Sequence, residues 1–136
     1  MPQKGEAGPR ILMSNRQELE LDWDAIVGVA ERTLSGEGSE GVELSLSFVT
    51  PGEMEGLHFR YLGEEGPTDV LSFPLGEDGL LGDVVVCPVE ASRNNPDLQA
   101  EVRLLVAHGV LHLLGYHHEE EDQRAAMWAK QAHYSS

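Results

Sequence analysis

The sequence has 136 residues, 40% of them apolar, and this length and composition predict one domain over residues 1–136 with a single core. Nine Lys and Arg against 24 Asp and Glu give a formal net charge of −15, which disfavours a protein that holds nucleic acid by charge alone. A single cysteine excludes an internal disulfide framework, and the lack of a signal-like start or a long apolar run predicts a cytoplasmic protein that does not span a membrane.

The first ten residues hold two Gly and two Pro without an apolar period, and we expect them to be loose. Beyond them, stretches with helical spacing of apolar residues alternate with stretches that have the period of two typical of strands. The predicted elements are a short strand over 11–13, a helix over 23–34, a strand over 42–48, a helix over 51–62, strands over 70–73 and 81–87, a long helix that is opened by 95–97 and ended by Gly115, and a helix over 119–133.

Local signals indicate where several of these elements begin and end. Asp22 is placed to cap the first helix, and Thr50 and Glu53 form the pattern of a capping box around Pro51. The turn residues 76–79 predict a hairpin between the two strands beside them. The element order predicts an α+β fold in which a small mixed sheet packs against one layer of helices.

Four of the six histidines lie between positions 108 and 118. His108 and His112 are four residues apart, a spacing that directs both side chains to the same side of a helix. Gly115 can adopt a positive φ and turn the backbone, which would bring His118 to the same point. Three imidazole nitrogens leave one position of a tetrahedral zinc ion open, so the spacing predicts one zinc site with hydrolytic chemistry.

The alternative is that these histidines are ordinary helix and surface residues. Leucines surround the helical pair in the sequence, and imidazoles buried among leucines need partners for their nitrogens, which favours a metal. The spacing also matches the zinc-protease pattern H-E-x-x-H-x-x-G-x-x-H, but Gly109 stands where that pattern has the glutamate that acts as general base. Peptidase activity is therefore disfavoured.

Two separated motifs resemble the YbeY family of bacterial metal-dependent endoribonucleases, which act in ribosomal RNA maturation. Residues 108–118 are similar to the family pattern H-G-x-L-H-L-x-G-Y-D-H, and residues 67–74 to P-T-D-V-L-S-F-P. The segment 82–84 is similar to the family's G-D-I, so the resemblance covers nearly the whole chain. It implies a zincin-like metal helix, cleavage of single-stranded RNA, and one zinc ion on His108, His112 and His118.

The chain departs from the family pattern at two positions. His117 stands where the family has Asp, so it is a neighbouring candidate that competes with His118, which we choose by register. Leu62 stands where the family pattern L-N-x-x-Y-R has its arginine. Arg60 is the candidate catalytic substitute that would hold the phosphate, although its position two residues earlier on the helix favours a surface charge as the alternative.

Two carboxylates are further candidates. Asp69 is placed to accept a hydrogen bond from a ligand imidazole, with a local turn role as an equal alternative. The resemblance gives Asp83 a role in partner contact or in the shape of the site, again against a turn role. Elsewhere, we expect Cys87 to be buried and Trp128 to pack into the core.

The resulting hypothesis is a zinc-dependent endoribonuclease that acts in maturation and quality control of the small-subunit ribosomal RNA. Its expected partners are ribosomal RNA and small-subunit proteins, and neither DNA nor a membrane. The alternative is a non-catalytic ribosome assembly factor that zinc stabilises, which the charge of −15 and Leu62 favour. A metallopeptidase is the weakest alternative.

Overall fold

The computed structural model describes residues 10–39, 41–77 and 79–136. Positions 1–9 of the segment that we expected to be loose lie outside the described residues, and Arg10 already belongs to a strand. The strands are β1 (Arg10–Asn15), β2 (Glu43–Phe48), β3 (Val70–Glu77) and β4 (Leu80–Val86). The helices are α1 (Trp23–Gly36), α2 (Pro51–Leu62), α3 (Pro88–Ala91), α4 (Leu98–Leu113) and α5 (Glu121–Ser135).

The predicted helices and strands are all present, with ends that differ by a few residues. The short helix α3 was not predicted, because four residues are too few to show an amphipathic period. None of the helices in the described ranges is long and apolar enough to cross a membrane.

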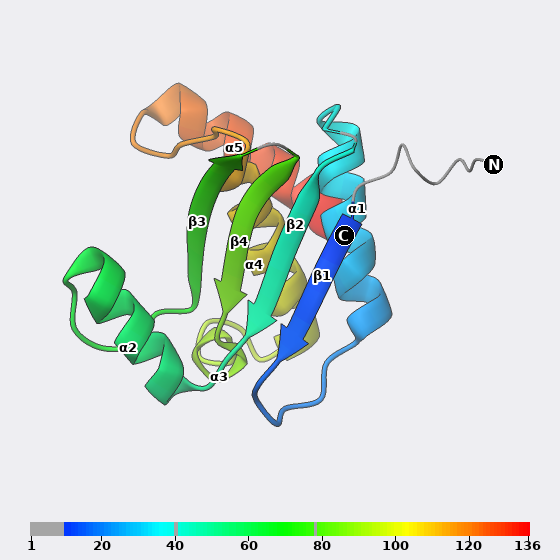
Figure 1. Cartoon of the computed structure of the whole chain (residues 1–136). Helices are drawn as coiled ribbons and strands as arrows, with labels where there is room; N and C mark the ends of the chain where they lie inside the picture. Colours follow the sequence, from blue (N-terminus) through cyan, green and yellow to red (C-terminus); the bar gives the residue numbers. More distant parts are fainter. Residues whose placement is uncertain (1–9, 40, 78) are drawn as a thin grey trace.

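The strands form one mixed sheet in the order β1-β2-β4-β3 (Figure 1). β1 pairs with β2 and β2 with β4 in parallel, whereas β3 and β4 form the predicted antiparallel hairpin. The predicted α+β class with a small mixed sheet is confirmed. The hairpin leaves β3 at the edge of the sheet, beside the C-terminal half of α4 and the end of α2.

One face of the sheet is covered by α1 and α4, with α5 packed on α4 (Figure 1). The alternation in β2 has the predicted effect, because Leu44, Leu46 and Phe48 are fully buried on this face. They belong to the main core together with apolar residues of α1 and α4 such as Ile26 and Val106. This core fixes the position of α4, which carries two of the candidate ligands.

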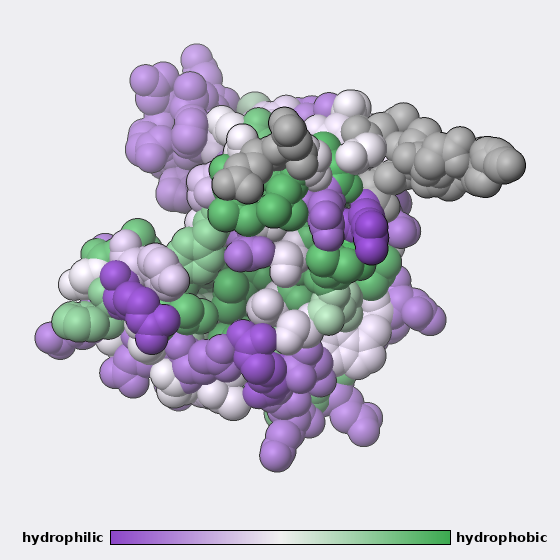
Figure 2. All heavy atoms as spheres, viewed as in Figure 1, coloured by the Kyte–Doolittle hydropathy of each residue, from purple (hydrophilic) through white to green (hydrophobic). Residues whose placement is uncertain are grey.

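The opposite face of the sheet is only partly covered. We expected a single layer of helices, but α2 packs on this second face. There Met54 joins a small cluster with Leu71 and Val85. Figure 2 views this face and shows apolar and polar patches side by side on it. α2 thus covers only the part of this face around Leu71 and Val85, and the rest of the face stays open.

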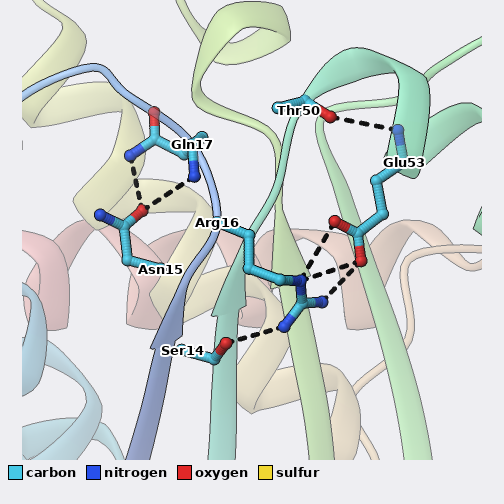
Figure 3. Close-up of polar contacts among 6 residues, drawn as sticks. All are labelled: Ser14, Asn15, Arg16, Gln17, Thr50 and Glu53. Atoms are coloured by element: carbon cyan, nitrogen blue, oxygen red, sulfur yellow. Dashed lines mark hydrogen bonds and ion pairs between the residues drawn. The ribbon is translucent and has the colours of Figure 1, made fainter.

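The start of α2 is tied to the end of β1 across the open face (Figure 3). Thr50 caps α2 as predicted, since its hydroxyl accepts a hydrogen bond from the Glu53 N–H at 3.3 Å. The Glu53 carboxylate does not complete a capping box; it binds the Arg16 guanidinium at 2.7 and 3.0 Å. Arg16 also donates to the Ser14 hydroxyl at 2.7 Å. This bidentate pair links two elements that are distant in the sequence.

Candidate metal centre

Gly109 lets α4 approach the sheet closely. A Cβ atom at this position would lie 2.6 Å from Cγ1 of Val84 on β4, a distance that real side chains do not adopt. The backbone carbonyl of Gly109 also accepts a hydrogen bond from the Ser72 hydroxyl of β3 at 3.1 Å. The glycine that replaces the protease glutamate is therefore a packing residue at the contact between helix and sheet.

A Schellman motif ends α4 and starts the loop that carries the third histidine. Gly115 has φ +103°, as expected for the residue that turns the chain out of the helix. Its N–H donates to the His112 carbonyl, and the Tyr116 N–H donates to the Leu111 carbonyl, each at 3.0 Å. This turn reverses the chain direction and places His118 beside the helix face that carries the other two.

The three predicted imidazoles converge. The ring centroids of His108 and His112 lie 4.6 Å apart, those of His112 and His118 lie 5.0 Å apart, and those of His108 and His118 lie 5.8 Å apart. Each ring offers a nitrogen, and these three nitrogens all lie within 4.8 Å of one another. His108 and His112 are half-buried and His118 is exposed, so the group opens to solvent on one side.

The electrostatics of the group keep its central ring neutral. Burial, reinforced by the adjacent His108 and His118, lowers the pKa of His112 to about 4. A neutral imidazole has the free lone pair that a metal ligand needs, whereas an imidazolium has none. At neutral pH the His112 ring is thus in its ligating form.

Gln131 on α5 orients His108. The Nδ1 atom of His108 lies 2.9 Å from Oε1 of Gln131. An amide oxygen accepts, so Nδ1 carries the proton and Nε2 is left as the ligating atom. No pattern in the sequence marks Gln131, because it lies 23 positions from His108 and reaches it only through the packing of α5 on α4.

The three histidines line one side of a cleft of about 640 Å³. Its other walls come from β3, from Leu62 at the end of α2 and from Glu119 in the loop before α5. Among the described residues that line the cleft, none is Lys or Arg, whereas Asp69 and Glu119 are acidic. Leu62 is 56% exposed, so the position where the family pattern has arginine does border the cleft but offers no charge.

The other candidate residues lie outside the histidine group. Asp69 lines the cleft, but its carboxylate accepts a hydrogen bond from Asn94 at 2.9 Å and not from a ligand imidazole. Arg60 is exposed, with its guanidinium carbon 5.9 Å from the centre of the Tyr61 ring, and it is not among the residues that line the cleft. The second position from Leu62 on a helix faces away, which accounts for this placement.

Asp83 and His117 are likewise separate. Asp83 lies on β4 and borders a cavity of about 320 Å³ on the open face of the sheet, together with Tyr61 and Phe73. It therefore cannot contact the imidazoles on the other side of the sheet. His117 is exposed and does not join the group of three ring nitrogens, which contains His118.

Two further expectations concern α5 and the core. Cys87 is fully buried, as predicted. The prediction for Trp128 is wrong, because its side chain is 54% exposed and Met127 is the buried residue of this turn. The alanines beside Trp128 suggested a packed stripe, but α5 turns a neighbouring face toward α4.

Comparison with known proteins decides the family. The model of the family described as "Endoribonuclease YbeY" matches residues 12–136. This chain belongs to the YbeY family. The family match spans both the histidine motif and the strand motif at 67–74, as the sequence resemblance indicated.

Several relatives described as "Endoribonuclease YbeY" align with this YbeY-family chain. The protein of Streptomyces griseus is 38% identical over 139 residues, which cover 88% of this chain and 84% of that protein. The protein of Frankia casuarinae is 45% identical over 108 residues, which cover 66% of this chain and 54% of that protein.

A solved structure shares the fold. The solution structure of TM1509 from Thermotoga maritima superposes with a TM-score of 0.64 at 30% sequence identity, and the match covers 92% of this chain and 86% of that one. The architecture described above is therefore also that of a solved protein.

Proposed function

We propose that this protein is a zinc-dependent endoribonuclease that cleaves single-stranded RNA, with small-subunit ribosomal RNA in the cytoplasm as its substrate. The observation that carries the proposal is the convergence of His108, His112 and His118 at the wall of an open cleft, in a chain of the YbeY family. The relatives at 38–45% identity are described as endoribonucleases. Maturation and quality control of the ribosome are the roles that this substrate implies.

The donor set fits zinc. Three imidazole nitrogens on a pattern that leaves one side exposed match the three-ligand arrangement of catalytic zinc sites. The low pKa of His112 keeps its ring neutral, and the hydrogen bond from Nδ1 of His108 to Gln131 orients the His108 ring. A zinc ion held there would supply Lewis-acid chemistry to a phosphodiester bond.

Residues of the cleft and of α5 would bind the substrate and orient the ligands. The substrate strand would lie in the cleft along β3, where the three rings stand on one wall. Gln131 holds the His108 ring in place while the substrate enters. Leu62 borders the same cleft as an uncharged surface, so binding of the phosphate backbone receives no cationic support at this position.

Gly109 argues against a metallopeptidase. A general base of the zinc-protease type would need a carboxylate at this position, next to the first histidine. The space beside Gly109 is occupied by Val84, so the fold leaves no room for such a side chain without a shift of the sheet. Cleavage of a phosphodiester bond depends less on a carboxylate general base than cleavage of a peptide bond does, since metal ions stabilise charge on phosphoryl oxygens directly.

A non-catalytic assembly factor is the second candidate. It is favoured by the acidic lining of the cleft, where Asp69 and Glu119 stand without a Lys or Arg among the described lining residues, and by the net charge of −15. In that case the small-subunit proteins would bring the RNA, and zinc would only stabilise the fold. The two functions differ in one property, which is turnover.

The experiment is a cleavage assay with purified, zinc-loaded protein on a single-stranded RNA, a duplex RNA and a single-stranded DNA of the same sequence. We expect cleavage of the single-stranded RNA only, and loss of cleavage with a chelator and in His112→Ala. His117→Ala is the matched control, since it removes an adjacent exposed histidine and should retain activity. Absence of cleavage with intact zinc binding would overturn the enzyme and favour the assembly factor.

A further inference from the structure

The carboxylate of Glu37, at the C-terminal end of α1, gathers three hydrogen bonds from two other parts of the chain. Its Oε1 accepts from the Tyr116 hydroxyl at 2.6 Å. Its Oε2 accepts from the Tyr134 hydroxyl at 2.6 Å and from Nζ of Lys130 at 3.0 Å. We call these four residues the Glu37 cluster. It connects α1, the loop after α4, and α5.

The Glu37 cluster holds an ionised carboxylate in a largely buried position. The Glu37 side chain is only 11% exposed. Burial raises the pKa of Glu37, but the hydrogen bonds from Tyr116, Tyr134 and Lys130 outweigh that effect and leave the pKa below its usual value. Charge-assisted hydrogen bonds of this kind are stronger than neutral ones, so the contact to each hydroxyl is a firm restraint.

The partners of Glu37 on α5 are themselves fixed. The guanidinium of Arg32 donates to the Tyr134 carbonyl, and Nε of Arg103 donates to the Ser135 carbonyl, both at 3.0 Å. Gly36 leaves room for the Tyr134 ring, because a Cβ atom there would overlap that ring and its hydroxyl. The carboxylate is therefore anchored on one side to a rigid helix end.

On its other side, the Glu37 cluster includes Tyr116 of the loop between α4 and α5, which carries His118 and which we call the metal loop. Tyr116 stands between Gly115, which turns the chain, and His118, which supplies the third ring. Nζ of Lys130 also lies 5.7 Å from the centre of the Tyr116 ring. Within the described residues no hydrogen bond is made to the His118 ring, whereas His108 has Gln131. The position of His118 thus depends on the backbone that Tyr116 holds.

We infer that Glu37 is a positioning residue for the third metal ligand, and that it acts through the Tyr116 hydroxyl. The inference rests on the metal site of the proposed function and adds a group that touches neither metal nor substrate. Residues that orient a metal ligand typically contribute 10–100-fold to metal affinity. The same carboxylate binds Tyr134, which lies on α5 and not in the loop that carries His118. A positioning role therefore requires the Tyr116 contact and not the Tyr134 contact, whereas general stabilisation would require both.

The test compares Tyr116→Phe with Tyr134→Phe in the full chain. Each variant removes one hydroxyl that lies 2.6 Å from the same carboxylate, and only the first lies in the metal loop. The probe is Co²⁺, whose visible absorption reports the number and geometry of its ligands. We expect Tyr116→Phe and Glu37→Gln to bind Co²⁺ about 10–100-fold more weakly with a changed spectrum, and Tyr134→Phe to bind nearly as the parent does.

Two further variants complete the design. Glu31→Gln removes an exposed carboxylate from the same helix and should leave Co²⁺ binding unchanged. The double variant Glu37→Gln with Tyr116→Phe should bind Co²⁺ no more weakly than the weaker single variant, because both changes break one path. Circular dichroism of the metal-free proteins checks folding, and if Glu37→Gln does not fold, the comparison of the two tyrosine variants decides.

The outcomes are distinct. Equal losses of Co²⁺ affinity in Tyr116→Phe and Tyr134→Phe, or an unchanged affinity and spectrum in Tyr116→Phe, would overturn the positioning role and leave the proposed function intact. A parent protein that does not bind Co²⁺ through its histidines would overturn the metal site itself, and with it the proposed function.

Discussion

The Nδ1 atom of His108 and the Oε1 atom of Gln131 lie 2.9 Å apart, and this contact joins the metal helix α4 to α5. It fixes both the ring orientation and the tautomer of His108, since the amide oxygen requires a proton on Nδ1. A ligand on a helix is thus set by a residue from another helix. The contact supports a direct prediction.

Gln131→Leu should weaken zinc binding about 10–100-fold, because the His108 ring loses its partner and the proton on Nδ1 is no longer favoured. Gln131→Glu should keep or strengthen binding, since a carboxylate accepts the same hydrogen bond. Competition with a chromophoric chelator measures both affinities. Gln123→Leu, at an exposed position of the same helix, is the control. Equal binding by Gln131→Leu and the parent would exclude this role.

Gly109→Ala should destabilise the protein by about 1–3 kcal/mol, because the new methyl group must displace Val84 or push α4 off the sheet. The control is Gly56→Ala on α2, where no atom lies within 4 Å of the added Cβ. That change should stabilise the protein by about 0.5–1 kcal/mol, as alanine favours the helix. Urea unfolding of both variants measures the two free energies, and opposite signs are required.

Leu62→Arg should tighten the binding of single-stranded RNA, because it places a cation at the wall of the metal cleft. One new phosphate contact should steepen the dependence of log affinity on log salt by about 0.7. The measurement uses fluorescence anisotropy in a His112→Ala background, where the RNA is not cut. Phe59→Arg, which adds the same charge to an exposed position of α2 outside the cleft, should have a smaller effect. Indistinguishable affinities and salt slopes for the two variants would contradict the prediction.

The metal-free protein should lose stability as the pH falls from about 6.5 to about 4. Burial lowers the pKa of His112 to about 4 in the folded chain, whereas an unfolded histidine has a pKa of about 6.5. Between these values the unfolded chain binds a proton that the folded chain does not, so unfolding is favoured. Above pH 7 both states are neutral at His112 and the effect vanishes.

The loss of stability is measured by urea unfolding of the parent and of His112→Asn. Both proteins are unfolded at pH 7.5 and at pH 5 in the presence of a chelator. The parent should lose more unfolding free energy than the variant between the two pH values, by on the order of 1 kcal/mol after solvent screening is allowed for. An identical pH dependence in the two proteins would show that His112 titrates normally.

The sequence predicted the parts of the site that depend on local geometry. The spacing of His108 and His112 sets their common side through the helical repeat, and Gly115 permits the turn that returns His118. The alternation in β2 and the hairpin before β4 were predictable for the same reason, since a period or a turn is encoded in neighbouring residues.

The parts that the sequence did not predict depend on how elements cross. Gln131 on α5 contacts His108, and Glu37 at the end of α1 contacts Tyr116 in the loop before His118. Neither Gln131 nor Glu37 lies in a motif or a periodic pattern that marks it. Trp128 was assigned to the core because its neighbours fit a stripe, but the rotation of α5 on α4 decides which stripe is buried. The local pattern predicted that Glu53 would complete a capping box with Thr50. The Glu53 carboxylate instead forms a salt bridge to Arg16, which is distant in the sequence.

Two of the converging rings stand on successive turns of one helix, whereas the third stands on the loop beyond Gly115. An ion held by all three would therefore leave in two stages, first from His118 when the loop swings outward and then from the helical pair. Local opening of a loop is faster and less costly than unfolding of a domain. The rate at which the ion exchanges with a competing chelator would then follow the motion of a few residues, independently of how stable the whole molecule is.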